Sequence, residues 1–133
     1  MPSSGPSAFS DLPASPDLPP MTPLLVACLC AEWCGSCRDY RATFESQALL
    51  AAAGERFAWI DIEDHADVLG ELEIETFPTL LIGDARGHVH FYGSVTPHAR
   101  TLERLVAGAR AGELKAIDDD AISALAARVR ALA

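Results

Sequence analysis

The sequence has few positive charges and no long hydrophobic run, and each shortage argues against a class of function. Its 133 residues include 19 acidic and 10 basic side chains, which gives a net charge of −9. Such an acidic surface disfavours nucleic acid and anionic membranes, because Lys and Arg are needed to bind phosphate groups. No apolar run approaches the roughly 20 residues of a membrane-spanning helix. We therefore expect no nucleic-acid partner and no membrane association.

The start of the chain lacks the features of a secretory signal. Residues 2–23 contain no Lys or Arg, and seven prolines interrupt residues 1–23. A secretory signal needs a positive start and a continuous apolar stretch. We therefore predict a cytoplasmic protein whose residues 1–23 form a disordered tail. A short extended docking peptide is the alternative for this segment.

No cysteine lies outside a window of ten residues, which holds Cys28, Cys30, Cys34 and Cys37. Secreted scaffolds spread their cysteines along the chain to join distant segments. The cluster therefore indicates chemistry at one place.

Half of the residues are apolar, which suffices for the core of one domain. Hydrophobic periodicity and turn residues predict strands at 24–30, 57–62, 79–82 and 88–92, and helices at 34–53, 64–72, 96–111 and from 118 onward. The first strand, helix and strand require a parallel pair with a right-handed crossover, and the last two strands form a hairpin. We predict an α/β fold with a four-stranded mixed sheet covered by helices (β-α-β-α-β-β-α) over residues 24–112, and a helical extension over 113–133.

Capping residues and apolar stripes support the predicted helices. Asp64 and Thr96 are expected N-caps, Pro97 follows Thr96 at the first helical position, and Gly54 and Gly112 are expected stops. The residues predicted to face inward are Val68, Leu69 and Leu72; Leu102, Leu105, Val106 and Ala109; and Ile122, Leu125, Ala126, Val129 and Leu132.

The segment AEWCGSCR (31–38) joins the first strand to the first helix. Cys34 lies at the start of this helix, where unpaired N–H groups and the helix dipole favour a thiolate, the attacking species in disulfide exchange. Two intervening residues bring Cys37 round one turn, so that its sulfur can reach Cys34 and resolve a mixed disulfide. Gly35 and Ser36 are small and let a substrate chain approach. A CxxC motif beside a strand–helix–strand unit is typical of a redox site.

A second mark is Pro78, within TFPT (76–79), just ahead of the third strand. Proline does not fit inside a central strand but does fit at a strand's first residue. A cis peptide bond at this position would be a deliberate feature.

WCGSC, followed some forty residues later by FPT, a hairpin and a helix, resembles the thioredoxin family over about residues 24–112. The resemblance implies a thiol–disulfide oxidoreductase in which Cys34 is the nucleophile and Cys37 resolves. It further implies a cis bond before Pro78, a Phe77 backbone that pairs with the substrate chain, and a docking surface bordered by Trp33.

The sequence departs from the family pattern at several positions. The tail replaces an initial strand and helix, Ser36 replaces the motif's usual proline, and Ala42 replaces a helix-kinking proline. Cys28 and Trp59 stand where the family usually has a buried Asp and a nearby Lys, which help to deprotonate the resolving thiol. Glu32 is the nearest carboxylate in sequence and a possible auxiliary residue.

The remaining cysteines leave alternatives open. Cys28 could exchange with Cys37 as a third redox thiol, but Cys28 and Cys30 are more simply small core residues. A disulfide between them would be strained. The four cysteines could instead hold zinc or an iron–sulfur cluster, although their spacing is not that of paired zinc knuckles. The histidines are scattered, and we assign them no role.

These observations predict an enzyme that reduces or exchanges protein disulfides through Cys34 and Cys37. It needs no organic cofactor and no metal, and an upstream thiol donor must recycle it. A non-catalytic binding module that uses the face around Pro78 is the alternative. We expect a monomer, with a dimer through the last helix as the alternative.

Overall fold

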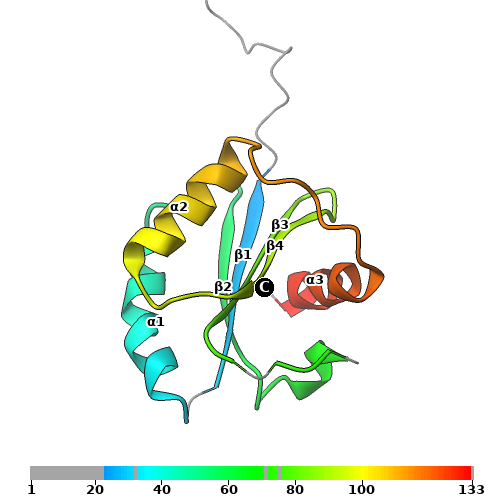
Figure 1. Ribbon diagram of the computed structural model, residues 1–133. Helices are drawn as coiled ribbons and strands as arrows, with labels where there is room; N and C mark the ends of the chain where they lie inside the picture. Colours follow the sequence, from blue (N-terminus) through cyan, green and yellow to red (C-terminus); the bar gives the residue numbers. More distant parts are fainter. Residues whose placement is uncertain (1–22, 32, 71, 75, 133) are drawn as a thin grey trace, which may run out of the picture.

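The computed structural model describes residues 23–31, 33–70, 72–74 and 76–132. The predicted tail, apart from Pro23, and the auxiliary candidate Glu32 lie outside the described residues. Figure 1 shows the elements, which are β1 (Leu24–Cys30), α1 (Gly35–Ala48), β2 (Arg56–Asp61), the 3-10 turn η1 (Ala66–Leu69), β3 (Thr79–Asp84), β4 (Val89–Ser94), α2 (Ala99–Arg110) and α3 (Asp120–Leu132).

The four strands form one mixed sheet in the order β2-β1-β3-β4. β1 pairs in parallel with β2 and antiparallel with β3, and β4 closes the hairpin antiparallel to β3. β4 and β2 are therefore the two edge strands. The predicted α/β fold is therefore confirmed.

Helices cover both faces of the sheet, with α1 and α2 on one side and α3 on the other (Figure 1). Successive residues of a strand point to opposite faces, and β1 is buried along its whole length. Val26, Cys28 and Cys30 belong to the core beneath α1 and α2, whereas Leu25 and Leu29 belong to the core beneath α3. This alternation places two sulfurs of β1 directly under the start of α1.

Two predicted helices were too long. α1 ends at Ala48, not at residue 53, and the chain continues through turns to Gly54, whose φ is +84°. Leu49 and Leu50 are 87% and 67% exposed, so extending the helix would bury no apolar face. The predicted helix at 64–72 is one 3-10 turn preceded by His65, not capped by Asp64. It is followed by Gly70, whose positive φ is incompatible with a continuing right-handed helix.

The last two helices begin later than predicted. His98, not Thr96, precedes α2, and the Thr96 hydroxyl lies 3.0 Å from that of Thr101. α3 begins at Asp120, where the Asp119 carboxylate accepts the N–H of Ile122. The predicted inward residues of both helices are buried or partly buried in the two cores, except Leu132, which is 45% exposed.

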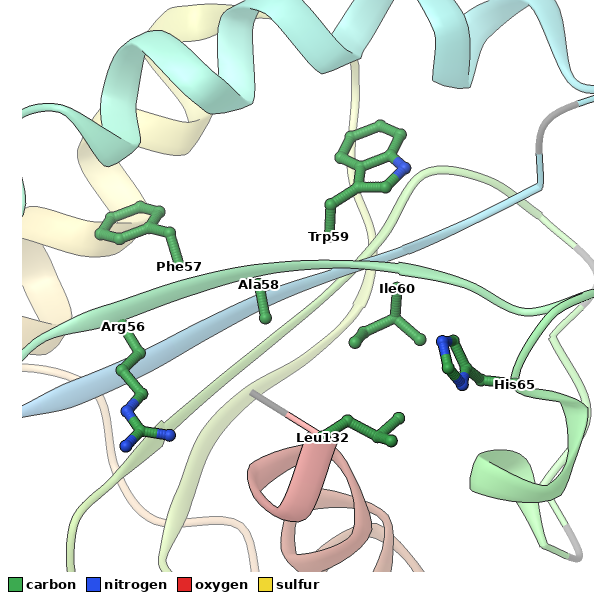
Figure 2. Close-up of a pocket in the computed structure, with 7 residues that line it drawn as sticks. All are labelled: Arg56, Phe57, Ala58, Trp59, Ile60, His65 and Leu132. Carbon is green, nitrogen blue, oxygen red and sulfur yellow. The ribbon is translucent and has the colours of Figure 1, made fainter.

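A hollow of about 440 Å³ lies along the edge strand β2. Figure 2 shows Phe57 and Trp59 on the α1 side of the strand, and Ala58 and Ile60 on the side of Leu132. No cysteine is among the described residues that line it. The hollow is therefore separate from the sulfur cluster.

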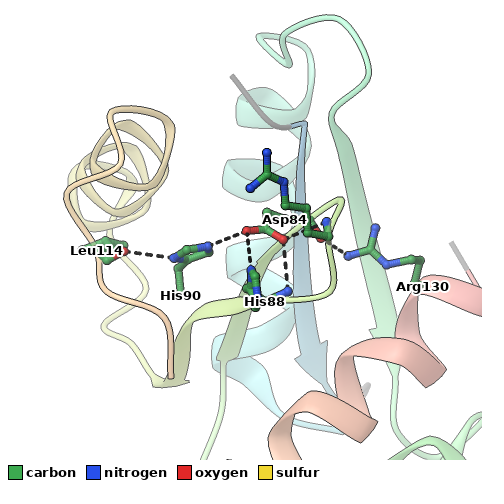
Figure 3. Close-up of polar contacts among 6 residues, drawn as sticks. Asp84, His88, His90, Leu114 and Arg130 are labelled. Carbon is green, nitrogen blue, oxygen red and sulfur yellow. Dashed lines mark hydrogen bonds and ion pairs between the residues drawn. The ribbon is translucent and has the colours of Figure 1, made fainter. Parts of the chain in front are cut away.

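The β3–β4 hairpin is tied to the rest of the fold through Asp84 (Figure 3). The Asp84 carboxylate accepts the backbone N–H groups of Arg86 and His88 and lies 2.8 Å from His90 Nε2. His90 Nδ1 lies 3.0 Å from the Leu114 carbonyl oxygen, and Arg130 of α3 donates to the Asp84 carbonyl oxygen. Both ring nitrogens of His90 therefore face oxygen atoms, one on each side of the hairpin contact.

Candidate active site

Cys34 occupies the N-cap of α1, at the point where the chain leaves the central strand. Its N–H donates to the Ala31 carbonyl oxygen at 3.0 Å, and its own carbonyl accepts the N–H of Arg38 at 3.2 Å. Its side chain is partly exposed and is not used as a helix cap. The Cys34 sulfur is therefore available at the positive end of the helix dipole.

The other three sulfurs lie beneath the surface. Cys28, Cys30 and Cys37 are 0%, 1% and 1% exposed. Cys30 and Cys37 form a disulfide with a Cα–Cα distance of 5.7 Å, and Cys28 Sγ lies 3.6 Å from Cys30 Sγ. Cys28 and Cys34 are free thiols. The sulfurs are therefore in contact in the order Cys37, Cys30, Cys28.

This pairing differs from both sequence-based expectations. Cys37 was expected to pair with Cys34, and Cys28 was considered as the third thiol; the structure joins Cys37 to Cys30. Cys30 lies in the core as predicted, but its bond to Cys37 was not predicted. A signal was present in the sequence, because Cys28 and Cys30 share one strand face and Cys30 is the nearer to the helix start.

Burial sets the protonation state of the innermost sulfur. Removal from water raises the pKa of Cys28 to about 12, so Cys28 remains a thiol at neutral pH. Since Cys30 carries no proton in the disulfide, Cys28 is the donor in their contact. Tyr40, in the next turn of α1 after Cys37, has a pKa raised by burial and also by the nearby Cys28. Its hydroxyl is buried without a hydrogen-bond partner among the described residues.

The aromatic residues expected to meet a substrate lie beside Cys34. Trp33 is 62% exposed, and its ring meets Phe77 edge-on at a centroid distance of 5.7 Å. Phe77 and Cys34 pack against the same core cluster. The peptide bond between Phe77 and Pro78 is cis, and the Pro78 carbonyl accepts the N–H of Val95. Trp33, Phe77 and Cys34 therefore gather at one end of the sheet.

The two small residues of the motif leave this surface open. Gly35 and Ser36 are exposed, and a Cβ atom added at Gly35 would meet nothing within 4 Å. This open surface allows another chain to approach Cys34.

The positions of the family's acid–base pair hold apolar groups. Cys28 is the β-sheet partner of Trp59, and the Trp59 ring packs against Phe44 at 5.8 Å and beneath the Arg41 guanidinium at 5.3 Å. The space that an acid and a lysine would share is filled by aromatic packing, so any proton transfer from Cys37 must use other groups.

Two of the four histidines lie together in the hairpin. His88 and His90 converge on Asp84 in the hairpin, which the sequence did not predict. Among the described residues, no group of three or more His, Cys, Asp or Glu side chains is placed to hold a metal ion. Within the same residues, no helix is long and apolar enough to cross a membrane.

The fold and the sulfur cluster are typical of a domain that carries out thiol–disulfide exchange. The family model described as Thioredoxin matches residues 19–108, and the chain therefore belongs to the thioredoxin family, as its sequence motifs predicted. The family and the clustered cysteines together indicate a thiol–disulfide oxidoreductase.

Solved thioredoxins share this fold. The germline-specific thioredoxin Deadhead of Drosophila melanogaster is 19% identical, with a TM-score of 0.57 over 65% of this chain and 80% of its own. The thioredoxin of Fasciola hepatica is 21% identical, with a TM-score of 0.57 and the same coverages. Mitochondrial thioredoxin 3 of Saccharomyces cerevisiae is 22% identical, with a TM-score of 0.55 over 65% and 78%. A comparison with curated protein sequences gives no significant match.

Proposed function

We propose that this protein reduces or exchanges protein disulfides, with Cys34 as the attacking thiol and Cys37 as the resolving thiol. The observation that carries the proposal is the accessibility of Cys34 at a helix N-terminus, while the other three cysteine side chains are at most 1% exposed. A substrate disulfide from solution can therefore meet Cys34 first.

The reaction has two exchange steps. The Cys34 thiolate attacks one substrate sulfur, forms a mixed disulfide and releases the other substrate sulfur as a thiolate. Cys37, one helical turn further on, then attacks the Cys34 sulfur. This step forms a Cys34–Cys37 disulfide and releases the reduced substrate, so that two electrons pass from the enzyme to the substrate. An upstream thiol donor must then reduce the enzyme disulfide.

The surface around Cys34 supports an extended protein substrate. The exposed Trp33 ring, which meets Phe77 edge-on, adjoins Cys34 in sequence, and Gly35 and Ser36 add little bulk. The Phe77 backbone, just before Pro78, would pair with the substrate chain as a short strand. The dithiol carries out the exchange without an organic cofactor, and we place the protein in the cytoplasm as a monomer.

Reduction of insulin disulfides with a dithiol donor tests this function. We expect turnover by the wild-type protein and none by Cys34→Ser, because the other three cysteines are at most 1% exposed. Ser46→Ala, at an exposed position on the same helix, is the matched control and should retain the wild-type rate. Wild-type protein that is folded and fully reduced, yet shows no turnover, would overturn the proposal.

A binding module without turnover is the second candidate. The favouring observation is that Cys37 is engaged with Cys30 while Cys34 stays free, because a captured partner would then not be released. Under this reading the wild-type protein retains a disulfide-containing peptide as a mixed disulfide. Rapid release of the reduced peptide would favour the enzyme instead.

A further inference from the structure

We propose that Cys30 is a third redox-active thiol. It attacks the Cys34–Cys37 disulfide, so that a Cys30–Cys37 disulfide is stored in the core and Cys34 becomes a free thiol. This inference deepens the proposed function and rests on it, because the exchange starts from the Cys34–Cys37 disulfide that substrate reduction leaves behind. The oxidised protein then retains a free thiol at its surface.

The position of Cys37 makes this exchange possible. Cys37 lies in the first turn of α1, three residues after Cys34, where side chains of a helix are neighbours. On its other side it meets Cys30, the last residue of β1, with 5.7 Å between their Cα atoms. Cys37 therefore has Cys30 bonded to it on one side and Cys34 one helical turn away on the other, so that either sulfur is a neighbour with which it can pair.

The exchange is balanced without an outside oxidant. Cys30, as a thiolate, attacks Cys37 Sγ, so that the Cys30–Cys37 bond forms as the Cys34–Cys37 bond breaks. Cys34 leaves as a thiolate, and the proton lost from Cys30 passes to Cys34 or to water. One disulfide is present before and after the step, and the number of electrons held by the protein is unchanged.

The surroundings of the three inner sulfurs distinguish Cys30 from Cys28. The Cys28 thiol lies 3.6 Å from Cys30 Sγ and can donate a hydrogen bond to it, which stabilises negative charge on Cys30 when the disulfide opens. Burial keeps Cys28 itself protonated, with a pKa of about 12. Because Cys30, and not Cys28, is bonded to Cys37, Cys30 is the nucleophile and Cys28 assists as a hydrogen-bond donor.

The stored disulfide is protected from solution. Because Cys30 and Cys37 are each 1% exposed, an external thiol cannot reach either sulfur directly. Cys34 is the exposed member of the cluster, so reduction must proceed by its return attack on Cys37. While the disulfide is stored, Cys34 lacks its resolving partner, and a substrate that it captures remains attached.

Peptide mapping of the oxidised protein tests the proposal directly. The fully reduced wild-type protein is oxidised with 2-hydroxyethyl disulfide, quenched with acid, alkylated with N-ethylmaleimide and cut after glutamate at acidic pH. Cleavage after Glu32 and Glu45 separates the peptide that carries Cys28 and Cys30 from the peptide that carries Cys34 and Cys37. We expect these peptides to be joined by a disulfide, with the maleimide on Cys34. A disulfide confined to residues 33–45 would overturn the proposal.

Two matched alanine variants identify which sulfur of β1 takes part. Cys28 and Cys30 lie on the same face of one strand and are equally buried. We expect Cys30→Ala to lose the cross-linked peptide and Cys28→Ala to retain it. If the cross-link persists in Cys30→Ala, Cys28 is the partner and the proposal fails. Cys30→Val gives the same readout if the alanine variant does not fold.

The insulin assay separates this inference from the proposed function. Turnover without a cross-linked peptide would leave the oxidoreductase intact and remove the role of Cys30. A cross-linked peptide without turnover would support the exchange within the core and refute the proposed reduction of protein substrates.

Discussion

The two faces of the central sheet use the same strands and differ in what the alternate residues carry. Toward α3, β1 contributes Leu25, Ala27 and Leu29 to a core of hydrocarbon side chains. Toward α1 and α2 it contributes Cys28 and Cys30 to a core that also contains Cys37. A cysteine packs as a small apolar residue, so one face can carry redox chemistry while remaining as dry as the other. The stability of the fold and its reactivity therefore depend on different sides of one strand.

The largest difference in stability between variants of the two faces is expected when a large side chain between α3 and the sheet is shortened. Leu125 is fully buried there, and Leu125→Ala should lower the free energy of unfolding by about 2–5 kcal/mol, the usual cost of an unfilled cavity. Cys28→Ala, on the opposite face, should cost about 1 kcal/mol. Urea unfolding of the reduced proteins measures both, and the insulin reduction rate per folded molecule of Leu125→Ala should stay at the wild-type value. Equal losses of stability, or a lower rate in Leu125→Ala, would contradict this division.

A smaller effect is expected at the hairpin bond between Asp84 and His90. Burial alone would raise the pKa of Asp84, but hydrogen bonds from His90 and from the N–H groups of His88 and Arg86 outweigh it and hold the pKa below its usual 3.8. Asp84→Asn should cost about 1–3 kcal/mol at neutral pH, because a hydrogen bond to a charged group is lost.

The pH dependence of this variant has a definite sign. Since the pKa of Asp84 is lower in the folded than in the unfolded protein, its stabilisation is present above pH 3.8 and is lost as the pH falls through the folded-state value. The gap in unfolding free energy between wild type and Asp84→Asn should therefore narrow in acid. Glu103→Gln, on the exposed side of α2, should show no such change. If the difference in unfolding free energy between wild type and Asp84→Asn does not change with pH, the ionised Asp84 carboxylate is not the cause of that difference.

On the sulfur-bearing face, an effect as small as that of Cys28→Ala, but of opposite sign, is expected at Tyr40. Its buried hydroxyl lacks a partner among the described residues, and an unsatisfied buried polar group is destabilising. Tyr40→Phe should therefore raise the free energy of unfolding by about 1 kcal/mol. Thermal unfolding of the reduced protein measures the change. A loss of stability would instead show that the hydroxyl is hydrogen-bonded in solution.

The strands and the position of the site could be predicted from the sequence, because both depend on local patterns. β1 has the predicted bounds, since the run LLVACLC is fully buried, and Cys34 lies at the predicted helix start. Less predictable were features that depend on contacts between distant residues. The period of a strand places Cys30 on the face of Cys28, but only packing of α1 against that face brings Cys37 to Cys30. His90 likewise reaches the Leu114 carbonyl across 24 positions of sequence.

Helix ends were predicted least well, because capping chemistry competes with packing. Thr96 and Pro97 have the composition of a helix start, yet both residues precede α2. The N–H of the adjacent Val95 is bonded to the Pro78 carbonyl, which ties this segment to the start of β3. The Ala-rich residues after Ala48 favour a helix by propensity, but the large side chains among them, Leu49 and Leu50, are exposed and contribute little packing that would extend it. In both places the tertiary contacts decide where the helix ends.

The disulfide between Cys30 and Cys37 spans seven positions of sequence, and this short span ties folding to oxidation. Closing such a loop in the unfolded chain removes conformational entropy and favours the folded state by about 2–3 kcal/mol in the chain-entropy model. Folding and oxidation form one thermodynamic cycle. The disulfide is therefore more stable against reduction in the folded chain than in the unfolded chain, by the same free energy. Reduction and unfolding of this protein therefore promote one another.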